Sequence, residues 1–389
     1  MGEGTLQALG SDDLFPFVRR GKTMARVAIV GAGVAGLTAA LYATTAGHQV
    51  VVLDRTGRLG GRATSEHVDG VPFGFGPHLL LNNGPLAKVV KKISRLKMAL
   101  APLRTDRLHV HGHGLIRPRG DVKTAANNRA LLRSNEPSSP LVQAVNMLAN
   151  MGQSDKHQSR IAALLKQRLM VVGEGWAGLV GRMAAALDEV GVLIEPDSDV
   201  VGIEDREVVL SDGRRFASDV VIVACGWRRA RPLLEPLLRG QCPDLVSVKA
   251  STLDVRLSSR PLGERQCVVD PGRNGLILAL SSIQPKMDVS GSLLSVAAVG
   301  VHGETTEQRA DRLMELMDVH AAGWRDHTME QRLQRSITVQ TKGNKPPFDV
   351  LSEQGILLAG EWVDTIHLLS DAAAHSGRIA GSNIIKALP

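Results

Sequence analysis

The stretch Val27–Asp54, VAIVGAGVAGLTAALYATTAGHQVVVLD, decides the fold class of this chain. Its first residues, Val27–Val30, are apolar and largely β-branched, which is typical of a buried parallel strand. A G-x-G-x-x-G spacing follows. Its first glycine permits a tight turn, its second lets the backbone approach a pyrophosphate, and its third lets a helix pack closely on the strand. These glycines are Gly31, Gly33 and Gly36.

The residues after the glycines complete a dinucleotide-binding unit. We expect a helix at Ala35–Ala46, with its N-terminal N–H groups and dipole directed at the phosphates, and Gly47 ends it. Gln49–Leu53 is a second apolar strand with Asp54 at its end. An acid about 20 residues past the glycines is the usual partner of a ribose hydroxyl. The unit therefore predicts an α/β fold with a Rossmann-type nucleotide site.

Two further segments carry a family resemblance. Arg58–Ser65 has the sequence RLGGRATS, and Gly355–Ile385 contains A-G-E followed by S-G-x-x-A. With the glycine motif, they resemble the FAD-dependent amine oxidase, phytoene desaturase and protoporphyrinogen oxidase superfamily. Phe75–His78 resembles the desaturase segment that passes near the flavin, and Gly173–Gly226 resembles the middle block of the family. The resemblance covers roughly half of the chain.

The resemblance implies a Rossmann-type FAD-binding domain interleaved with a second, α+β substrate domain whose sheet roofs the flavin. The expected FAD domain comprises residues 24–84, 167–240 and 346–389, and the expected substrate domain comprises residues 85–166 and 241–345. Residues 1–23 form an expected N-terminal leader, with Met24 as an alternative start. Within the substrate domain we expect strands at 245–259, 275–280 and 293–301 and an amphipathic helix at 305–320.

The resemblance also implies a role for individual residues in a non-covalent FAD site. Asp54 would accept from the adenosine ribose, Arg62 would donate to the phosphates, and Val200 would lie beside the adenine. The last helix would direct its N-terminus at the pyrimidine edge of the flavin, where its dipole stabilises the negative charge of the reduced state. The other implied contacts are Gly31, Ala32, Gly33, Val34, Ala35, Gly36, Arg55, Gly60, Gly61, Gly360, Glu361, Ser370, Asp371 and Ala373.

Two positions differ from many relatives. Asp54 stands where many have Glu, which changes how far the carboxylate reaches but not its ability to accept a hydrogen bond. Thr56 stands where some amine oxidases place an additional Arg. In this superfamily the substrate gives a hydride to flavin N5, so the cofactor carries the difficult step and no nucleophile–base pair is needed. The flavin-proximal candidates are His78 and Lys249, the latter as a possible counterpart of the lysine that holds a water near N5 in amine oxidases.

The aromatic content bears on the substrate. The chain has 6 Phe, 4 Trp and 1 Tyr, and the tyrosine, Tyr42, lies in the first expected helix. Amine oxidases hold the amine between aromatic rings, usually tyrosines, so the composition favours an apolar, isoprenoid or lipid-like substrate; a compositional bias of the source explains it equally well. The terminal block has no Cys for a covalent flavin link.

Three alternatives stay open beside desaturase-like chemistry. The first is an amine oxidase-type flavoenzyme. The second is a non-catalytic, GDP-dissociation-inhibitor-like binding protein on the same scaffold, which the intact phosphate loop disfavours. The third is an NAD-dependent dehydrogenase, which the terminal block disfavours. His109, His111 and His113 alternate as in a strand and could pair at a metal, but Gly112 and Gly114 favour a hairpin turn, so we expect no metal.

The charge distribution suggests a partner surface. Pro85–Asn150 holds twelve Lys or Arg residues against three acidic ones, whereas the whole chain carries a net charge of only +7. A solvated face explains this, and so does contact with an anionic membrane through Lys88–Arg133. Nucleic acid is disfavoured because no aromatic residues interleave with the basic ones.

Cysteine content and hydropathy bear on location. Three Cys residues without metal-ligand spacing fit a reducing compartment, and no apolar run approaches the roughly 20 residues of a membrane span. We therefore expect a cytoplasmic protein, with peripheral membrane contact as an option. The pattern is compatible with any oligomeric state.

Overall fold

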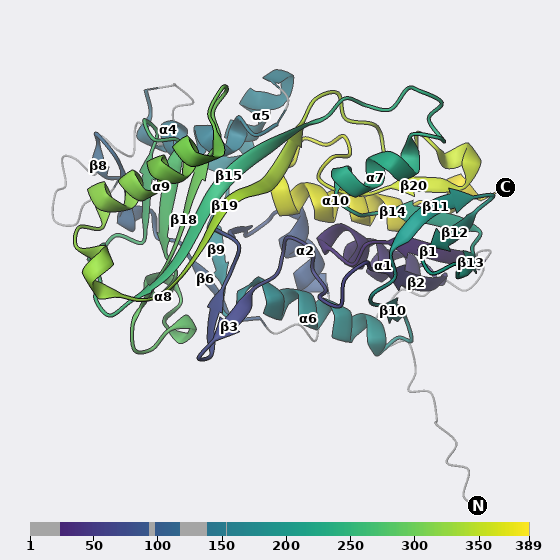
Figure 1. The fold of residues 1–389 in the computed structure, drawn as a ribbon, viewed down its shortest axis with the longest axis horizontal. Helices are drawn as coiled ribbons and strands as arrows, with labels where there is room; N and C mark the ends of the chain where they lie inside the picture. The colour runs from purple at the N-terminus through teal and green to yellow at the C-terminus, as the bar shows by residue number, and fades with distance from the viewer. Residues whose placement is uncertain (1–23, 93–97, 117–137, 153, 389) are drawn as a thin grey trace, which may run out of the picture.

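The computed structural model describes residues 24–92, 98–116, 138–152 and 154–388. The expected leader, 1–23, lies outside them. Figure 1 shows two sheets at opposite ends of the molecule, joined by two long strands and flanked by helices. Among the described residues, no helix is both long and apolar enough to cross a bilayer.

The first sheet is the predicted Rossmann sheet. It has five parallel strands in the order β10-β2-β1-β14-β20. These strands are β1 (Arg26–Val30), β2 (Gln49–Leu53), β10 (Leu193–Glu195), β14 (Val220–Val223) and β20 (Ile356–Leu358). Their apolar runs are buried because side chains pack on both faces, as a parallel sheet requires. Pairing of β14 with both β1 and β20 brings the terminal block beside the first motif.

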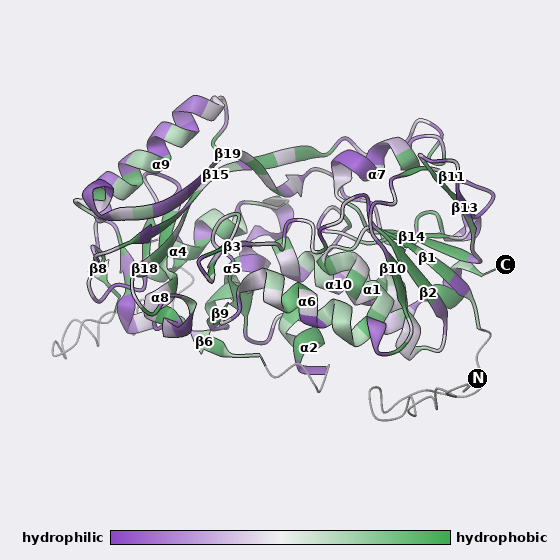
Figure 2. Cartoon of the chain, turned by 60° about the horizontal axis from the view of Figure 1, so that its bottom comes forward, coloured by the Kyte–Doolittle hydropathy of each residue, from purple (hydrophilic) through white to green (hydrophobic). Residues whose placement is uncertain are grey.

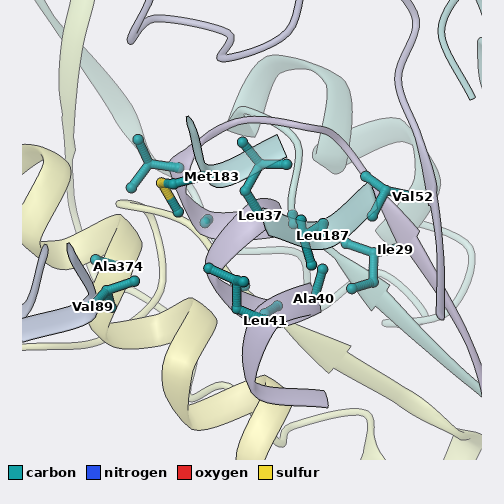
Figure 3. Close-up of a cluster of buried hydrophobic side chains, with 14 of the residues drawn as sticks. Ile29, Leu37, Ala40, Leu41, Val52, Val89, Met183, Leu187 and Ala374 are labelled. Atoms are coloured by element: carbon teal, nitrogen blue, oxygen red, sulfur yellow. The ribbon is translucent and has the colours of Figure 1, made fainter. Parts of the chain in front are cut away.

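Helices cover one face of this sheet. They are α1 (Val34–Thr45), α2 (Pro85–Lys92), α6 (Gly175–Asp188) and α10 (Leu369–Ser382). Figure 3 shows their shared core, where Leu37 and Leu41 of α1 meet Met183 and Leu187 of α6. The domain boundary expected after residue 84 stays a prediction, and α2 directly beyond it packs against α10.

The opposite face carries α7 (Trp227–Leu234) and a small antiparallel sheet. That sheet consists of β11 (Val200–Glu204), β12 (Glu207–Leu210) and β13 (Arg215–Ala217). Asp212 and Gly213 lie in the turn between β12 and β13, where the Asp212 carboxylate accepts from the backbone N–H of Arg214 at 3.0 Å. These two residues thus form the turn of the β12–β13 hairpin.

The second sheet has seven strands in the order β19-β15-β18-β17-β16-β7-β8. They are β7 (Leu108–Val110), β8 (Gly114–Leu115), β15 (Val246–Leu257), β16 (Cys267–Asp270), β17 (Gly275–Ala279), β18 (Ser292–Val299) and β19 (Thr328–Lys342). All neighbours are antiparallel except β16 and β7. The strands and the β7–β8 hairpin expected in this region are confirmed.

Two layers pack on this second sheet. On one face lies α9 (Thr306–His320), whose capping box joins Thr305 and Gln308 and which buries Leu313, Leu316 and Met317. In Figure 2, α9 is largely hydrophilic outside that stripe, whereas β1 and β14 are largely hydrophobic. The other face packs against α4 (Pro140–Ala149) and α8 (Leu280–Ile283). The amphipathic helix expected at 305–320 is thus confirmed.

The remaining elements connect the two sheets. β3 (Glu66–Val68) and β4 (Val71–Phe73) form a hairpin, and β5 (Leu80–Leu81), β9 (Leu169–Val172) and β6 (Leu100–Pro102) form a three-stranded sheet. Helix α5 (His157–Leu165) packs on α4. The three-stranded sheet lies between the large sheets, so the segments after the glycine motif lead directly from one to the other (Figure 1).

Candidate cofactor-binding site

Two of the three motif glycines are required by the protein itself. Gly31 has φ +109°, and a Cβ there would lie 2.9 Å from the backbone nitrogen of Cys225. A Cβ on Gly36 would lie 1.8 Å from the carbonyl oxygen of Gly31. The tight turn and the close packing of α1 on β1 therefore exclude any side chain at these two positions.

Gly33 is different, because nothing in the described chain requires a glycine there. Its φ is −78°, which any residue adopts, and the nearest described atom to a Cβ would be the Gly60 carbonyl oxygen at 3.8 Å. Helix α1 starts at the next residue, and no described side chain caps it. Uncapped N–H groups beside an open glycine form a cradle for an anion. The residues present thus fit a dinucleotide pyrophosphate.

The Asp54 carboxylate is held in place at the end of β2. Its Oδ2 accepts from the N–H of Ala32 at 2.7 Å, and its Oδ1 accepts from the N–H and hydroxyl of Thr56, each at 2.9 Å. Oδ2 therefore keeps a lone pair for a further donor such as a ribose hydroxyl. The Asp54 carbonyl accepts from the N–H of Ser198 at 2.7 Å, which brings the start of β11 with Val200 to the same edge.

The R-x-G-G-R loop lies against the glycine turn. The Gly60 N–H donates to the Ala32 carbonyl at 2.9 Å, and Gly60 pairs with Gly33 in an isolated bridge. Gly60 and Gly61 have φ values of +99° and +58°, so both need glycine's freedom. Arg55, the other residue predicted here, is exposed.

Arg62 and Glu361 join the two motifs to the second sheet. Arg62 donates to the Glu361 carboxylate at 3.2 Å and to the Val339 carbonyl of β19 at 3.2 Å. Glu361 is buried and also accepts from the N–H and hydroxyl of Thr341, each at 2.9 Å. Burial, partly offset by Glu361, lowers the pKa of Lys345 to about 8. Arg62 and Glu361, which the sequence predicts to contact the cofactor, thus both form hydrogen bonds with protein groups.

The terminal block sets α10 against α1. A Cβ on Gly377 would lie 2.2 Å from the Ala35 carbonyl oxygen, and one on Gly381 would lie 2.3 Å from the Ala39 carbonyl oxygen. Gly360, with φ +147°, donates its N–H to the Ser376 hydroxyl at 2.8 Å. The S-G-x-x-A-G pattern is therefore a packing motif that fixes α10 beside the phosphate turn.

The first turn of α10 contains the predicted residues Ser370, Asp371 and Ala373. Asp371 is buried and accepts from the N–H of Leu86 in α2 at 2.9 Å, and burial raises its pKa to about 6. Its side chain is thus directed at α2. Ser370 and Ala373 are half-buried.

The two flavin-proximal candidates occupy different surroundings. The ring of His78 lies 5.0 Å from that of Trp176, and burial lowers its pKa to about 4, so it is neutral at physiological pH. Lys249 is exposed, and its ammonium donates to the Thr338 hydroxyl at 2.7 Å. His78 is thus half-buried against Trp176, whereas Lys249 is exposed.

The sequence reasoning missed Trp176, Thr341 and Asp254. Asp254 is buried on β15 and accepts from the Ser295 hydroxyl and, at 3.4 Å, from the N–H of Gly76 in the Phe75–His78 segment. Burial raises its pKa to about 7. The signal available was an acidic residue within an otherwise uncharged, half-apolar strand stretch, Ala250–Val255.

Comparisons with known proteins agree with this geometry. The profile of the NAD(P)-binding Rossmann-like domain matches residues 29–93. An uncharacterized protein of Methanothermococcus thermolithotrophicus is 36% identical over 72 residues, which is 18% of this chain and 70% of that protein. A carotenoid 3,4-desaturase of Haloarcula japonica is 47% identical over 51 residues, 13% of this chain and 10% of the desaturase. This chain thus spans only a small part of that curated enzyme.

Solved structures match over nearly the whole chain. An oxidoreductase from Methanosarcina mazei has a TM-score of 0.70 at 16% identity, covering 90% of this chain and 98% of that chain. Cyclohexylamine oxidase from Brevibacterium oxydans has a TM-score of 0.62 at 15% identity, covering 93% and 99%. At such identities the likeness shows the shared fold.

The fold and the family profile define a protein with a Rossmann-like dinucleotide-binding domain and a second domain built on the seven-stranded sheet. Beyond residues 29–93, the chain shares its fold with these two solved enzymes, and its partial sequence matches include a carotenoid desaturase.

Proposed function

We propose that the protein is an FAD-dependent oxidoreductase that removes a hydride from an apolar, isoprenoid or lipid-like substrate. The observation that carries the cofactor assignment is Gly33: the protein has room for a side chain there, yet the residue is glycine. A pyrophosphate approaching the backbone explains this choice. A scaffold protein that had lost its flavin would have no need of it.

Different elements of the chain would contact different parts of FAD. The N-terminus of α1 and the backbone at Gly33 bind the pyrophosphate, and Asp54 accepts from the ribose. When bound, the flavin supplies the electrophilic N5 that accepts the hydride. The N-terminus of α10 would then stabilise negative charge at the pyrimidine edge, because a helix dipole is positive there.

The second sheet supports the roofing role that we assign to it. Its strand β15 contacts the Phe75–His78 segment through Asp254 and Gly76, and β19 contacts Arg62 through the Val339 carbonyl. Thr252 also approaches Gly76, since a Cβ there would lie 2.6 Å from the Thr252 methyl carbon. These contacts hold the sheet over the segments that carry the site, which would keep water from the reacting atoms.

The positions of the aromatic residues support an apolar substrate. Tyr42 lies in α1 with the Lys92 ammonium 4.5 Å from its ring centre, so one face of its ring is already occupied by a cation. Trp227 and Trp362 pack on each other in the core on the α7 face of the Rossmann sheet. A further ring pair, on segments that we expect near the flavin, is His78 with Trp176.

That same ring pair favours a second candidate, amine oxidation, because a neutral histidine and a tryptophan could flank an amine. Anaerobic reduction separates the two. The flavin absorbance of the purified protein should bleach with a polyene or prenyl substrate and stay unchanged with primary amines. Bleaching by amines alone would replace the proposal with amine oxidation.

The cofactor assignment has its own test in a pair of glycine variants. Gly33→Ala should fold and lose FAD, since the methyl group fits the protein but occupies the pyrophosphate's approach. Gly181→Ala, on the exposed side of α6 with no described atom within 4 Å of its Cβ, is the matched control and should keep FAD. Equal FAD content in both variants would overturn the assignment.

A further inference from the structure

Three potential metal ligands from distant parts of the chain meet where the paired strands β7 and β16 end. His111 follows β7, Asp270 ends β16, and His320 ends α9. Their ligand atoms all lie within 4.8 Å of one another. The flavin chemistry proposed above uses none of them.

We propose that His111, Asp270 and His320 form a binding site for a Zn²⁺-class transition-metal ion, with water in the fourth position. Two imidazoles and a carboxylate are a typical donor set for this class of ion. Such a site is open, with three protein ligands and one exchangeable position.

The distances fit tetrahedral coordination. Metal–ligand bonds of about 2.0–2.2 Å place neighbouring donor atoms roughly 3.2–3.5 Å apart. His320 Nε2 and Asp270 Oδ2 are already 3.1 Å apart. The His111 and His320 rings meet edge to face, with centres 5.2 Å apart and planes at 85°, and His111 is exposed, so its ring can turn to complete the site.

The backbone holds the three ligands independently of any ion. The His111 N–H donates to the Val269 carbonyl at 2.9 Å, next to Asp270. The Asp270 carboxylate also accepts from the N–H and the guanidinium of Arg273, at 3.1 and 3.0 Å, which fixes its orientation. His320 is the last residue of α9, where the negative end of the helix dipole favours a cation. The site is thus preorganised, as metal ligands require.

A fourth imidazole lies nearby. His109 lies on β7, two residues before His111, and its ring centre is 6.1 Å from that of His320. Its Nδ1 is buried and has no hydrogen-bond partner among the described residues. A nearby imidazole with an unpaired nitrogen is a reserve donor for the proposed ion.

The surrounding cations select the type of ion. Arg273 bonds Asp270, and the Arg265 guanidinium donates to the His320 carbonyl at 3.0 Å. Two positive charges disfavour Mg²⁺ and Ca²⁺, which depend on several carboxylates for binding. An ion that gains most of its affinity from imidazole nitrogen tolerates them better. Bound metal would link α9 to the β7–β8 edge of the sheet.

The test uses the full-length protein without a histidine tag, stripped of metal by a chelator and titrated with Zn²⁺ or Co²⁺. We expect one equivalent bound per chain, a melting temperature that rises with Zn²⁺, and visible Co²⁺ absorption from a site of low coordination number. His111→Ala and His320→Gln should each weaken binding at least tenfold. His302→Ala, an exposed histidine away from the cluster, should bind as the wild type does.

Two results would overturn the site: no Zn²⁺ bound at micromolar concentration by the wild type, or equal affinity in the wild type and His111→Ala. Since His111 is exposed, this variant decides the question even if His320→Gln fails to fold. The readouts do not depend on flavin, so a failed metal site leaves the proposed oxidoreductase function untouched.

Discussion

Gly31, Gly33 and Gly36 belong to one motif but are glycine for different physical reasons. A side chain on Gly31 would collide with the backbone of Cys225, and one on Gly36 would collide with the Gly31 carbonyl. A methyl group on Gly33 would meet no such obstacle. Substitution at the first or third position therefore disturbs folding, and substitution at the second disturbs binding. A pattern that looks uniform in sequence separates into structural and ligand-binding positions once the neighbouring atoms are known.

Asp54 offers a prediction at the same scale. Asp54→Ala should weaken FAD binding by about 1.5–3 kcal/mol, the range for a hydrogen bond to a charged group. Isothermal titration of the apoprotein with FAD measures it. Asp54→Asn keeps an acceptor for the Ala32 N–H, so its affinity for FAD should lie between those of the wild type and Asp54→Ala. This variant separates the effect of the turn geometry from the effect of the charge. Unchanged affinity in Asp54→Ala would show that the ribose lies elsewhere.

Asp254 makes a prediction about pH. Burial raises its pKa from 3.8 to about 7, so the folded protein binds a proton that the unfolded chain has released between these values. The contribution of Asp254 to stability therefore falls as pH rises through this window, by about 1.4 kcal/mol per pH unit. Above this pH window the buried carboxylate is ionised, and the folded protein carries the whole free-energy cost of burying that charge.

Asp254→Asn removes this cost and keeps acceptors for Ser295 and Gly76. Its free energy of unfolding, relative to wild type, should grow with pH across the window and level off above pH about 7. Urea unfolding of both proteins at several pH values gives the difference, in which the other titrating groups cancel. Parallel pH profiles would contradict the raised pKa.

At the scale of elements, the contact between α1 and α10 makes one site from two distant motifs. Their backbones approach so closely that Gly377 and Gly381 face the carbonyls of Ala35 and Ala39. Gly377→Ala should destabilise the protein by about 1–3 kcal/mol, as overpacking of a tight contact does. Thermal unfolding of the apoprotein measures this. Gly181→Ala on α6 is the control and should be neutral or stabilising, so equal stability of the two variants would contradict the packing role.

The sequence predicts the elements of this fold better than the contacts between them. Val27–Leu53 could be assigned because β-branched runs and a glycine turn are local features. The pairing of Arg62 with Glu361 could not, because it depends on how β19 lies against the Rossmann domain. The register of β15 and β19 shifts at three places, and no local pattern encodes those shifts.

The residues of the candidate sites likewise divide into those that local sequence patterns predict and those that only tertiary contacts bring together. The phosphate turn and the place of Asp54 follow from spacing alone, whereas the His111–Asp270–His320 cluster joins residues that no periodicity connects. The family resemblance makes Lys249 a candidate for the lysine near flavin N5, but its side chain is exposed. The direction of a side chain depends on the face of the sheet that becomes buried, which is a tertiary property.

At the scale of the whole molecule, the charge of Lys88–Arg133 makes a prediction about location. Lys88, Lys91 and Lys92 lie on α2, and much of the remaining stretch lies outside the described residues. We propose that this segment holds the protein at an anionic membrane, where an apolar substrate dissolves. Each basic residue near such a surface contributes about 1 kcal/mol, screened over about 8 Å at physiological salt.

Sedimentation with liposomes tests this attachment. Binding should increase with anionic lipid content and fall as salt rises, and a variant with Lys88, Lys91 and Lys92 replaced by Gln should bind more weakly at low salt. Equal, negligible sedimentation with neutral and anionic liposomes at low salt would leave the basic stretch as a solvated face.

The central claim is that both motifs hold one FAD, and the flavin content of the purified protein tests it most directly. The account predicts a yellow wild-type protein that releases about one FAD per folded chain on heat or acid denaturation. It also predicts a folded, colourless Gly33→Ala with the melting temperature of the wild-type apoprotein. A wild-type protein that is colourless and takes up no added FAD, or a Gly33→Ala protein with full flavin content, would contradict it.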